Sequence, residues 1–94
     1  MKTSIVTLSR KVEKRLSKLP THIKEALFVW VMSVEAEGIS RVRLLPGYHD
    51  EPLKGDRLGQ RSIRLSKAYR AFYVQDENSN SKEILVEEVN KHEY

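Results

Sequence analysis

The sequence predicts an α+β domain in which a short N-terminal strand and a helical hairpin pack on one face of an antiparallel sheet. Apolar residues recur at helical spacing up to residue 38, and strand-like alternation begins at residue 61. Helices that precede a run of strands are typical of α+β domains with the helices on one side of the sheet. Ninety-four residues suit one domain, 1–94, with a single modest core. We therefore expect the element order β-α-α-β-β-β.

The first strand and the first helix are predicted for the segment up to residue 18. Ile5 and Val6 stand among hydroxyl residues at 4–8, which favours a short strand. Ser9 is suited to cap a helix that ends near Lys18. Apolar residues at i, i+4 and i+7 form a narrow stripe on this helix: Val12, Leu16 and Leu19. The rest of its surface is strongly basic, with Arg10, Lys11, Lys14, Arg15 and Lys18.

A second helix is predicted from Thr21 to Gly38. Pro20 ends the preceding helix, and Thr21 is placed to be the N-cap of the next one. Its apolar stripe consists of Ile23, Leu27, Trp30, Val31 and Val34. Phe28 and Met32 widen this stripe, and we expect both in the core with Trp30. The short connection between the helices favours an antiparallel hairpin.

The second half of the chain predicts strands around a polar loop. Residues 41–45 can form a short helical turn, and residues 48–60 are rich in turn-forming and polar side chains. Three strands follow, at 61–65, 68–75 and 82–89. Together they form an antiparallel meander.

Composition excludes several classes of protein. The chain has no cysteine, so disulfides and thiolate metal sites are ruled out. No apolar run approaches the length of a membrane span, and the N-terminus does not resemble a signal peptide. We expect a cytoplasmic protein with no membrane partner.

Charge is distributed unevenly along the chain. Residues 41–70 carry eight Lys and Arg against three Asp and Glu, whereas residues 71–94 carry two against six. Clustered cations attract phosphates, so a polyanionic partner is the favoured explanation of the basic middle segment. The alternative is a solvated basic surface without a ligand.

Candidate catalytic side chains gather in the loop 48–61 and in the tail 91–94. His49 and Lys54 lie in the loop, and His92 and Tyr94 follow the last strand at i and i+2. Histidine can act as acid or base near neutral pH, and cations can stabilise a charged phosphorane. This combination suits a metal-free ribonuclease that needs no cofactor. A solvent-exposed, inert terminus is the alternative for the tail.

Cations and aromatic residues also decorate the predicted strands. Arg61 and Arg64 are separated by an odd number of residues and should face opposite sides of the sheet. The alternative to an RNA-binding role for these arginines is surface pairing with Glu87 and Glu88. Tyr69 and Tyr73 share one strand face; we favour packing for them, although one tyrosine near the basic loop could stack on a nucleobase.

Residues 46–74 and 88–94 resemble the RelE/HigB toxins of bacterial type II toxin–antitoxin systems. The marks of the resemblance are PLKG at 52–55, the dipeptide Tyr69-Arg70 at the start of a strand, and the ending EVNKHEY. The order of elements matches as well. The resemblance implies a compact, microbial-RNase-like domain of the HigB-like branch.

The activity implied by the resemblance is ribosome-dependent cleavage of mRNA. The products would carry a 2′,3′-cyclic phosphate and a 5′-hydroxyl, and no metal is required. The catalytic residues carried over by position are His49, Lys54, Arg70, His92 and Tyr94. The residues expected to bind RNA or the ribosome are Arg57, Arg61, Arg64 and Lys67. The implied partners are the ribosome, mRNA and a cognate antitoxin with a helix-turn-helix, and operator DNA is contacted only through the antitoxin complex.

Two positions depart from the pattern of these toxins. Glu51 stands where relatives can have a histidine, and Ser66 stands where many have an arginine. The general base therefore stays open between His49, Glu51, His92 and Tyr94. Two other functions are considered: a non-enzymatic gyrase poison of the same fold, similar to ParE, and an inactive member that binds RNA or its antitoxin.

Overall fold

A five-stranded sheet with strand order β1-β5-β4-β3-β2 forms the centre of the computed structural model, which describes residues 4–76 and 82–91. Its strands are β1 (Ser4–Leu8), β2 (Glu51–Pro52), β3 (Arg61–Arg64), β4 (Tyr69–Asp76) and β5 (Lys82–Lys91). β3, β4 and β5 form the predicted antiparallel meander, and β2, in the segment predicted to be a loop, adds to it by pairing antiparallel with β3. β1 instead runs parallel to β5, so the sheet is mixed. A parallel pair needs a long connection, and here the helices and the other strands all lie between β1 and β5 in the chain.

The first helix begins where the sequence predicts. Ser9 is the N-cap of α1 (Arg10–Arg15), and the Val12 N–H donates to Ser9 Oγ at 3.2 Å. The helix tightens into the 3-10 turn η1 (Leu16–Lys18) before Pro20. The Ser9 hydroxyl also donates to the Glu87 carbonyl oxygen at 3.1 Å, which ties the start of α1 to β5.

The prediction that Thr21 is an N-cap is wrong by one residue. Pro20 occupies the cap, and Thr21 is the first residue of α2 (Thr21–Glu37). The N–H groups of Ile23 and Lys24 donate to the Pro20 carbonyl at 3.0 and 3.1 Å. Thr21 is therefore already inside the first turn, where its hydroxyl cannot serve as the N-cap. Gly38, with φ of 91°, ends α2 as expected and leads into α3 (Ile39–Val42).

The core lies between α2 and the sheet. Ile23, Leu27, Trp30 and Val34 are fully buried, and they pack with buried residues from every large element: Val12, Leu19, Ile39, Val42, Ile63, Ala71, Tyr73, Ile84, Val86 and Val89. The rings of Trp30 and Tyr73 meet with their centroids 5.3 Å apart. These contacts fix α2 on the sheet.

Phe28 and Met32 do not belong to this core, contrary to prediction. Their side chains are 42% and 61% exposed. At 3.6 residues per turn, Phe28 and Met32 lie roughly 130° and 170° from the centre of the buried stripe. The sheet covers only one stripe of α2, so an apolar residue beyond it faces solvent.

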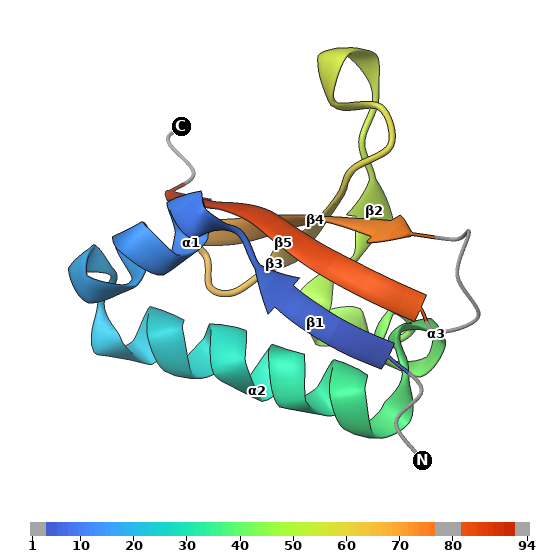
Figure 1. Ribbon diagram of the computed structural model, residues 1–94, viewed down its shortest axis with the longest axis horizontal. Coiled ribbons are helices and arrows are strands. Elements are labelled where there is room, and N and C mark those ends of the chain that lie inside the picture. Colours follow the sequence, from blue (N-terminus) through green and yellow to red (C-terminus); the bar gives the residue numbers. More distant parts are fainter. Residues whose placement is uncertain (1–3, 77–81, 92–94) are drawn as a thin grey trace.

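Figure 1 shows α2 along one side of the sheet and the 53–59 segment projecting from the other side. This segment includes the 3-10 turn η3 (Gly55–Arg57), and an earlier turn, η2 (Pro46–Tyr48), leads into β2. The start of α1 lies beside the end of β5 (Figure 1). In the described part of the chain, no helix is long and apolar enough to cross a membrane.

A bulge interrupts the pairing of β4 with β5. Phe72 pairs with Glu88 and Tyr73 pairs with Val86, which leaves Glu87 as the extra residue on β5. A bulge re-aims side chains on the strand that contains it. Here two adjacent glutamates both contact residues of the projecting segment, Gln60 and Arg57.

Candidate functional site

Three charged residues from separate elements meet on the uncovered face of the sheet. Glu88 of β5 accepts from Arg57 of η3, with Nη2 and Oε2 3.2 Å apart. Its other oxygen lies 3.5 Å from Lys11 Nζ of α1. The Asn90 amide adds a hydrogen bond of 2.6 Å to Glu88 Oε2. One carboxylate therefore orients two cations that are far apart in the sequence.

Arg57 is held over the sheet by two further contacts, one of them to a glutamine that is itself hydrogen-bonded to β5. Its guanidinium carbon lies 4.4 Å from the centre of the Phe72 ring, which is a cation–π geometry. Arg57 Nη1 also donates to Gln60 Oε1 at 2.9 Å, and Gln60 Nε2 donates to Glu87 Oε1 at 2.7 Å. These contacts use one edge and one face of the guanidinium, and they fix its position. The Arg57 side chain nevertheless stays 40% exposed.

The electrostatic environment keeps Glu88 ionised. Burial alone raises the pKa of this carboxyl, but hydrogen bonds from Asn90 and Arg57 and the charges of Arg57 and Lys11 outweigh burial. The pKa of Glu88 therefore lies below its ordinary value. The group is an anion at neutral pH and serves to position its two cations.

Arg70 lies on the same open face as this cluster. It is two residues from Phe72 on β4, and its register partner on β5 is Asn90. Its Nη1 lies 3.4 Å from Ser62 Oγ and 3.7 Å from Glu51 Oε1. The Glu51 side chain is 61% exposed, so its contact with Arg70 leaves it open to a ligand.

Beside these residues the face is hollowed. An open cavity of about 550 Å³ is lined by the projecting segment and by β4 and β5: Asp56, Arg57, Leu58, Gly59, Gln60, Val74, Glu87 and Glu88. In the described ranges, 4–76 and 82–91, no three His, Asp or Glu side chains come together as ligands for a metal ion. The chemical groups available at this face are guanidinium, ammonium and carboxylate.

Arg61 points to the other side of the sheet and has a structural environment. Its Nε donates to Asp50 Oδ1 at 2.6 Å, and the Tyr73 hydroxyl donates to Asp50 Oδ2 at 2.5 Å. The Asp50 side chain is only 1% exposed. Burial, the hydrogen bond to Asp50 and its charge raise the pKa of Tyr73, so this tyrosine stays neutral in alkaline solution. Arg61 therefore anchors the 46–52 segment to the sheet, and its RNA-binding role stays a prediction.

The other predicted site residues are spread over the molecule. His49 is exposed and adopts a left-handed backbone with φ of 46° at the end of η2. Lys54 is exposed at the start of η3, three residues before Arg57. Lys67 is exposed in the turn between β3 and β4, while Arg64 pairs in register with Arg70. The tail residues His92 and Tyr94 lie outside the described residues.

Sequence reasoning did not place Lys11, Phe72 or Glu88 in the candidate site. Lys11 was one of five cations on the basic back of a helix, and only its approach to β5 distinguishes it. Pairing of Glu88 with arginines of the central strands was the alternative to an RNA-binding role, and in the structure Arg61 pairs with Asp50 while Arg70 lies beside Glu51. The signal that could have identified Glu88 is its place beside Glu87, where strict alternation fails and a bulge is required.

Comparison with models of protein families gave no match, and a search of curated protein sequences gave none either. Solved structures do match. RelE in the archaeal RelE–RelB complex from Pyrococcus horikoshii superposes with a TM-score of 0.71 at 22% identity, over 95% of this chain and 94% of that one. The chain has the fold of the RelE toxins.

Two further solved structures of toxins have the same fold as this chain. One is the toxin–antitoxin complex RelBE2 from Mycobacterium tuberculosis, with a TM-score of 0.64 at 23% identity over 94% of this chain and 96% of that one. The other is the YoeB/ParE toxin from Agrobacterium tumefaciens, with 0.67 at 21% identity over 99% and 100%. The predicted RelE-like fold is thus confirmed over nearly the whole chain.

Proposed function

We propose that this chain is the toxin of a toxin–antitoxin pair and that it cleaves mRNA on the ribosome. The observation that carries the proposal is the group of cations on the uncovered face of a RelE fold: Lys11, Arg57 and Arg70. Such a group attracts phosphates, and the arginines can bind phosphate oxygens in a bidentate manner. The carboxylates beside them, Glu51 and Glu88, hold the guanidinium groups in place.

The reaction uses the 2′-hydroxyl of the RNA as its nucleophile. The hydroxyl oxygen attacks the adjacent phosphorus and the bond to the 5′-oxygen breaks, which leaves a 2′,3′-cyclic phosphate and a 5′-hydroxyl. A base must take the hydroxyl proton, and an acid must protonate the departing oxygen. Cations stabilise the additional negative charge of the phosphorane.

Arg70 and Arg57 are the groups that we assign to phosphorane stabilisation, with Lys54 on the projecting segment as a further cation. Glu51 is our choice of general base, because it is exposed beside Arg70 whereas Glu88 has both oxygens engaged. The proton donor to the leaving oxygen is proposed in the tail, at His92 or Tyr94. His49, on the left-handed turn next to Asp50, stays an alternative base.

The proposed partner that silences this activity is a cognate antitoxin, of the helix-turn-helix kind that the resemblance to RelE/HigB toxins implies. The RelE fold was solved as a complex with RelB in P. horikoshii, and a YoeB of the same fold as a complex with YefM in Staphylococcus aureus. A chain with a net charge of +4 favours a partner whose contacting surface is acidic. We propose that operator DNA is bound only through the antitoxin.

The test adds purified protein to translating ribosomes and maps mRNA 5′ ends by primer extension. We expect wild-type protein to produce cuts, and Arg70→Gln to reduce the cleavage rate by about a hundredfold, the scale of losing one group that stabilises the transition-state charge. Glu51→Gln should reduce cleavage without weakening ribosome binding. The control is Arg41→Gln, which removes the same charge from the exposed surface of α3 and should cut at the wild-type rate.

Two results would contradict the proposal. Equal cleavage by Arg70→Gln and Arg41→Gln would exclude the open face as the site. Accumulation of gyrase–DNA cleavage complexes without mRNA cuts would instead support the gyrase-poison alternative, which is consistent with the likeness to the YoeB/ParE toxin from Agrobacterium tumefaciens.

A further inference from the structure

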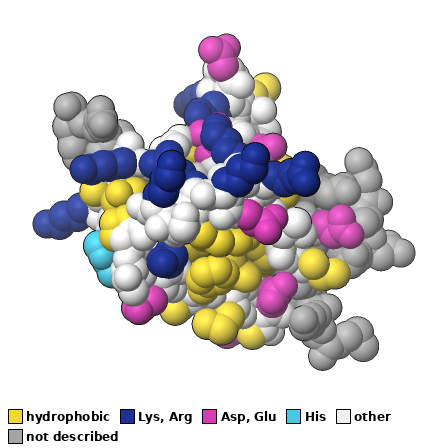
Figure 2. Space-filling model, turned by 60° about the vertical axis from the view of Figure 1, so that its left-hand side comes forward, with side chains coloured by type: hydrophobic (Ala, Val, Ile, Leu, Met, Phe, Trp, Pro, Cys, Tyr) yellow, Lys and Arg dark blue, Asp and Glu magenta, His cyan; other side chains and the backbone are white. Residues whose placement is uncertain are grey.

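A second basic site lies on α1, beside the cluster around Glu88. A cavity of about 400 Å³ opens there, and its walls are four cations, one buried leucine and one tyrosine: Lys11, Lys14, Arg15, Lys18, Leu19 and Tyr69. In the space-filling view, Lys and Arg side chains gather in a band across this side of the molecule (Figure 2). In the proposed reaction this cavity has no role.

The four cations share one helical stripe. Positions 11, 14, 15 and 18 are spaced at i, i+3, i+4 and i+7, which places them on one surface of α1 and η1. Like charges at this spacing destabilise a helix, and α1 has only six residues. A ligand that carries several negative charges at regular intervals would relieve this repulsion.

Tyr69 gives the cavity an aromatic wall. It is the first residue of β4 and is half-buried against the core, beside Leu19, which is 5% exposed. Lys91 is its register partner on β5 and adds another exposed cation next to the ring. An aromatic ring between cations suits the stacking of a planar base whose phosphates are bound on either side.

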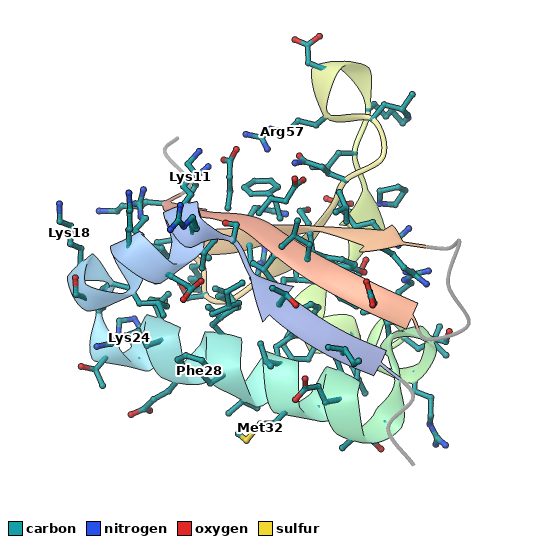
Figure 3. The ribbon with its side chains drawn as sticks, viewed as in Figure 1. Lys11, Lys18, Lys24, Phe28, Met32 and Arg57 are labelled. Carbon is teal, nitrogen blue, oxygen red and sulfur yellow. The ribbon has the colours of Figure 1, made fainter. Side chains whose placement is uncertain are left out.

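Lys11 connects the cavity to the open face of the sheet. It lines the cavity, and its ammonium also contacts Glu88, whose other oxygen binds Arg57. Figure 3 shows Lys18 on η1, Lys11 on α1, and Arg57 beyond Lys11 at the projecting segment. Cations therefore follow one another from η1 to the candidate site.

We propose that the α1 cavity binds single-stranded RNA, with its cations on consecutive phosphates and a base stacked on Tyr69. The strand then passes Lys11 and reaches the face that carries Arg57 and Arg70. A single strand is required because the bases of a duplex are paired and stacked out of reach of the ring. The identity of the ligand as RNA rests on the proposed function, whereas its place on α1 rests on the cavity.

The test measures binding without cleavage. Anisotropy of a fluorescein-labelled short oligouridine is recorded between about 50 and 200 mM salt for each variant, because the slope of log affinity against log salt counts the phosphates neutralised. Lys14→Gln and Lys18→Gln should each reduce this slope by about 0.7, the value for a single strand. Arg41→Gln, the control with the same charge change on α3, should leave the slope unchanged.

Tyr69→Leu tests the stacking half of the proposal. It should weaken oligouridine binding about tenfold at constant salt slope, since a stacked base contributes affinity without a charge. Binding of inorganic polyphosphate, which has no bases, should be the same for Tyr69→Leu and wild type. Thermal unfolding of each variant checks that the fold is intact.

Equal slopes for Lys14→Gln and Arg41→Gln would overturn the site, because the effect would then be one of net charge. If Tyr69→Leu weakened the binding of oligouridine and polyphosphate to the same degree, or weakened the binding of neither, base stacking would be excluded. The cavity would then be a plain anion site, suited to an acidic protein segment. The proposed function can fail separately from this site. If wild-type protein bound oligouridine through α1 but cut no mRNA on ribosomes, the binding site would be supported and the proposed ribonuclease activity would be contradicted.

Discussion

Two carboxylates show how the surroundings of a residue decide its role. Asp50 is buried and bridges Tyr73 and Arg61, so it stabilises the fold. Glu88 is only partly buried and bridges Arg57 and Lys11, so it holds two cations together on the open face. Each was one acidic residue in a charged segment of the sequence, and only their contacts separate them.

At Asp50 we predict a large loss of stability on Asp50→Ala. The substitution leaves the Arg61 charge and the Tyr73 hydroxyl without their acceptor, and breaking a buried pair in this way costs about 3–5 kcal/mol. Tyr73→Phe removes one hydrogen bond and should lower the free energy of unfolding by only about 1 kcal/mol. Urea unfolding at neutral pH measures both; similar values for the two variants would contradict the assigned network.

Because the pKa of Glu88 is lowered in the folded protein, we expect the free energy of unfolding to depend on pH. Its pKa in the folded protein is lowered below the ordinary value, so its contribution is present above the pKa of the unfolded chain, 4.5, and is lost as the pH falls through the folded pKa. Wild-type protein should therefore lose more unfolding free energy between pH 7 and pH 3 than Glu88→Gln does. Parallel urea titrations at the two pH values check this, and equal losses would show that the contacts of Glu88 are energetically neutral.

At the scale of elements, α1 is a short helix that presents the cations of one side of the protein. Six residues are too few for a helix to be stable by itself, so its position depends on the Ser9 cap and on burial of Val12. The Ser9 hydroxyl also reaches the Glu87 carbonyl at the bulge of β5. The start of α1 and the bulge are thus linked through one side chain.

Ser9→Ala should lower the free energy of unfolding by about 1–2 kcal/mol, because it removes the cap of α1. Ser9→Asp keeps an acceptor for the Val12 N–H and should recover most of the loss. Chemical unfolding followed by circular dichroism compares the three proteins. Full stability of Ser9→Ala would mean that packing of Val12 alone holds the helix.

At the scale of the whole molecule, the sheet has one face covered by α2 and one face open. The covered face takes the buried stripe of α2, and the open face carries the charged cluster and the cavity lined by Arg57 and Glu88. Stability and the candidate activity are therefore placed on opposite faces. Substitutions in the core should act on stability, and those on the open face should act on function.

Adjacent residues of α2 test this division. Leu27→Ala should lose about 2–5 kcal/mol, because Leu27 is fully buried, whereas Phe28→Ser should lose less than about 1 kcal/mol. Met32→Ser should behave in the same way as Phe28→Ser. Thermal or urea unfolding measures the difference; a Phe28→Ser variant as unstable as Leu27→Ala would mean that Phe28 is covered in solution.

By itself, the sequence determined the fold class, the strands 4–8 and 61–89, the Ser9 cap and the buried residues Ile23, Leu27 and Trp30. These follow from local spacing, which sets the side of a helix or strand on which each residue lies. The resemblance across residues 46–94 also anticipated the RelE fold, and Arg70 was correctly expected on a central strand.

Only the tertiary structure decided which charged residues meet. The parallel pairing of β1, the bulge at Glu87 and the approach of Lys11 to Glu88 all join segments far apart in the chain, and no local pattern encodes such contacts. Arg61 and Arg70 look alike in the sequence, yet Arg61 is tied to buried Asp50, whereas Arg70 lies on the open face beside exposed Glu51. Which side of the sheet α2 covers is a global outcome of packing, and it determines which of these arginines lies on the open face.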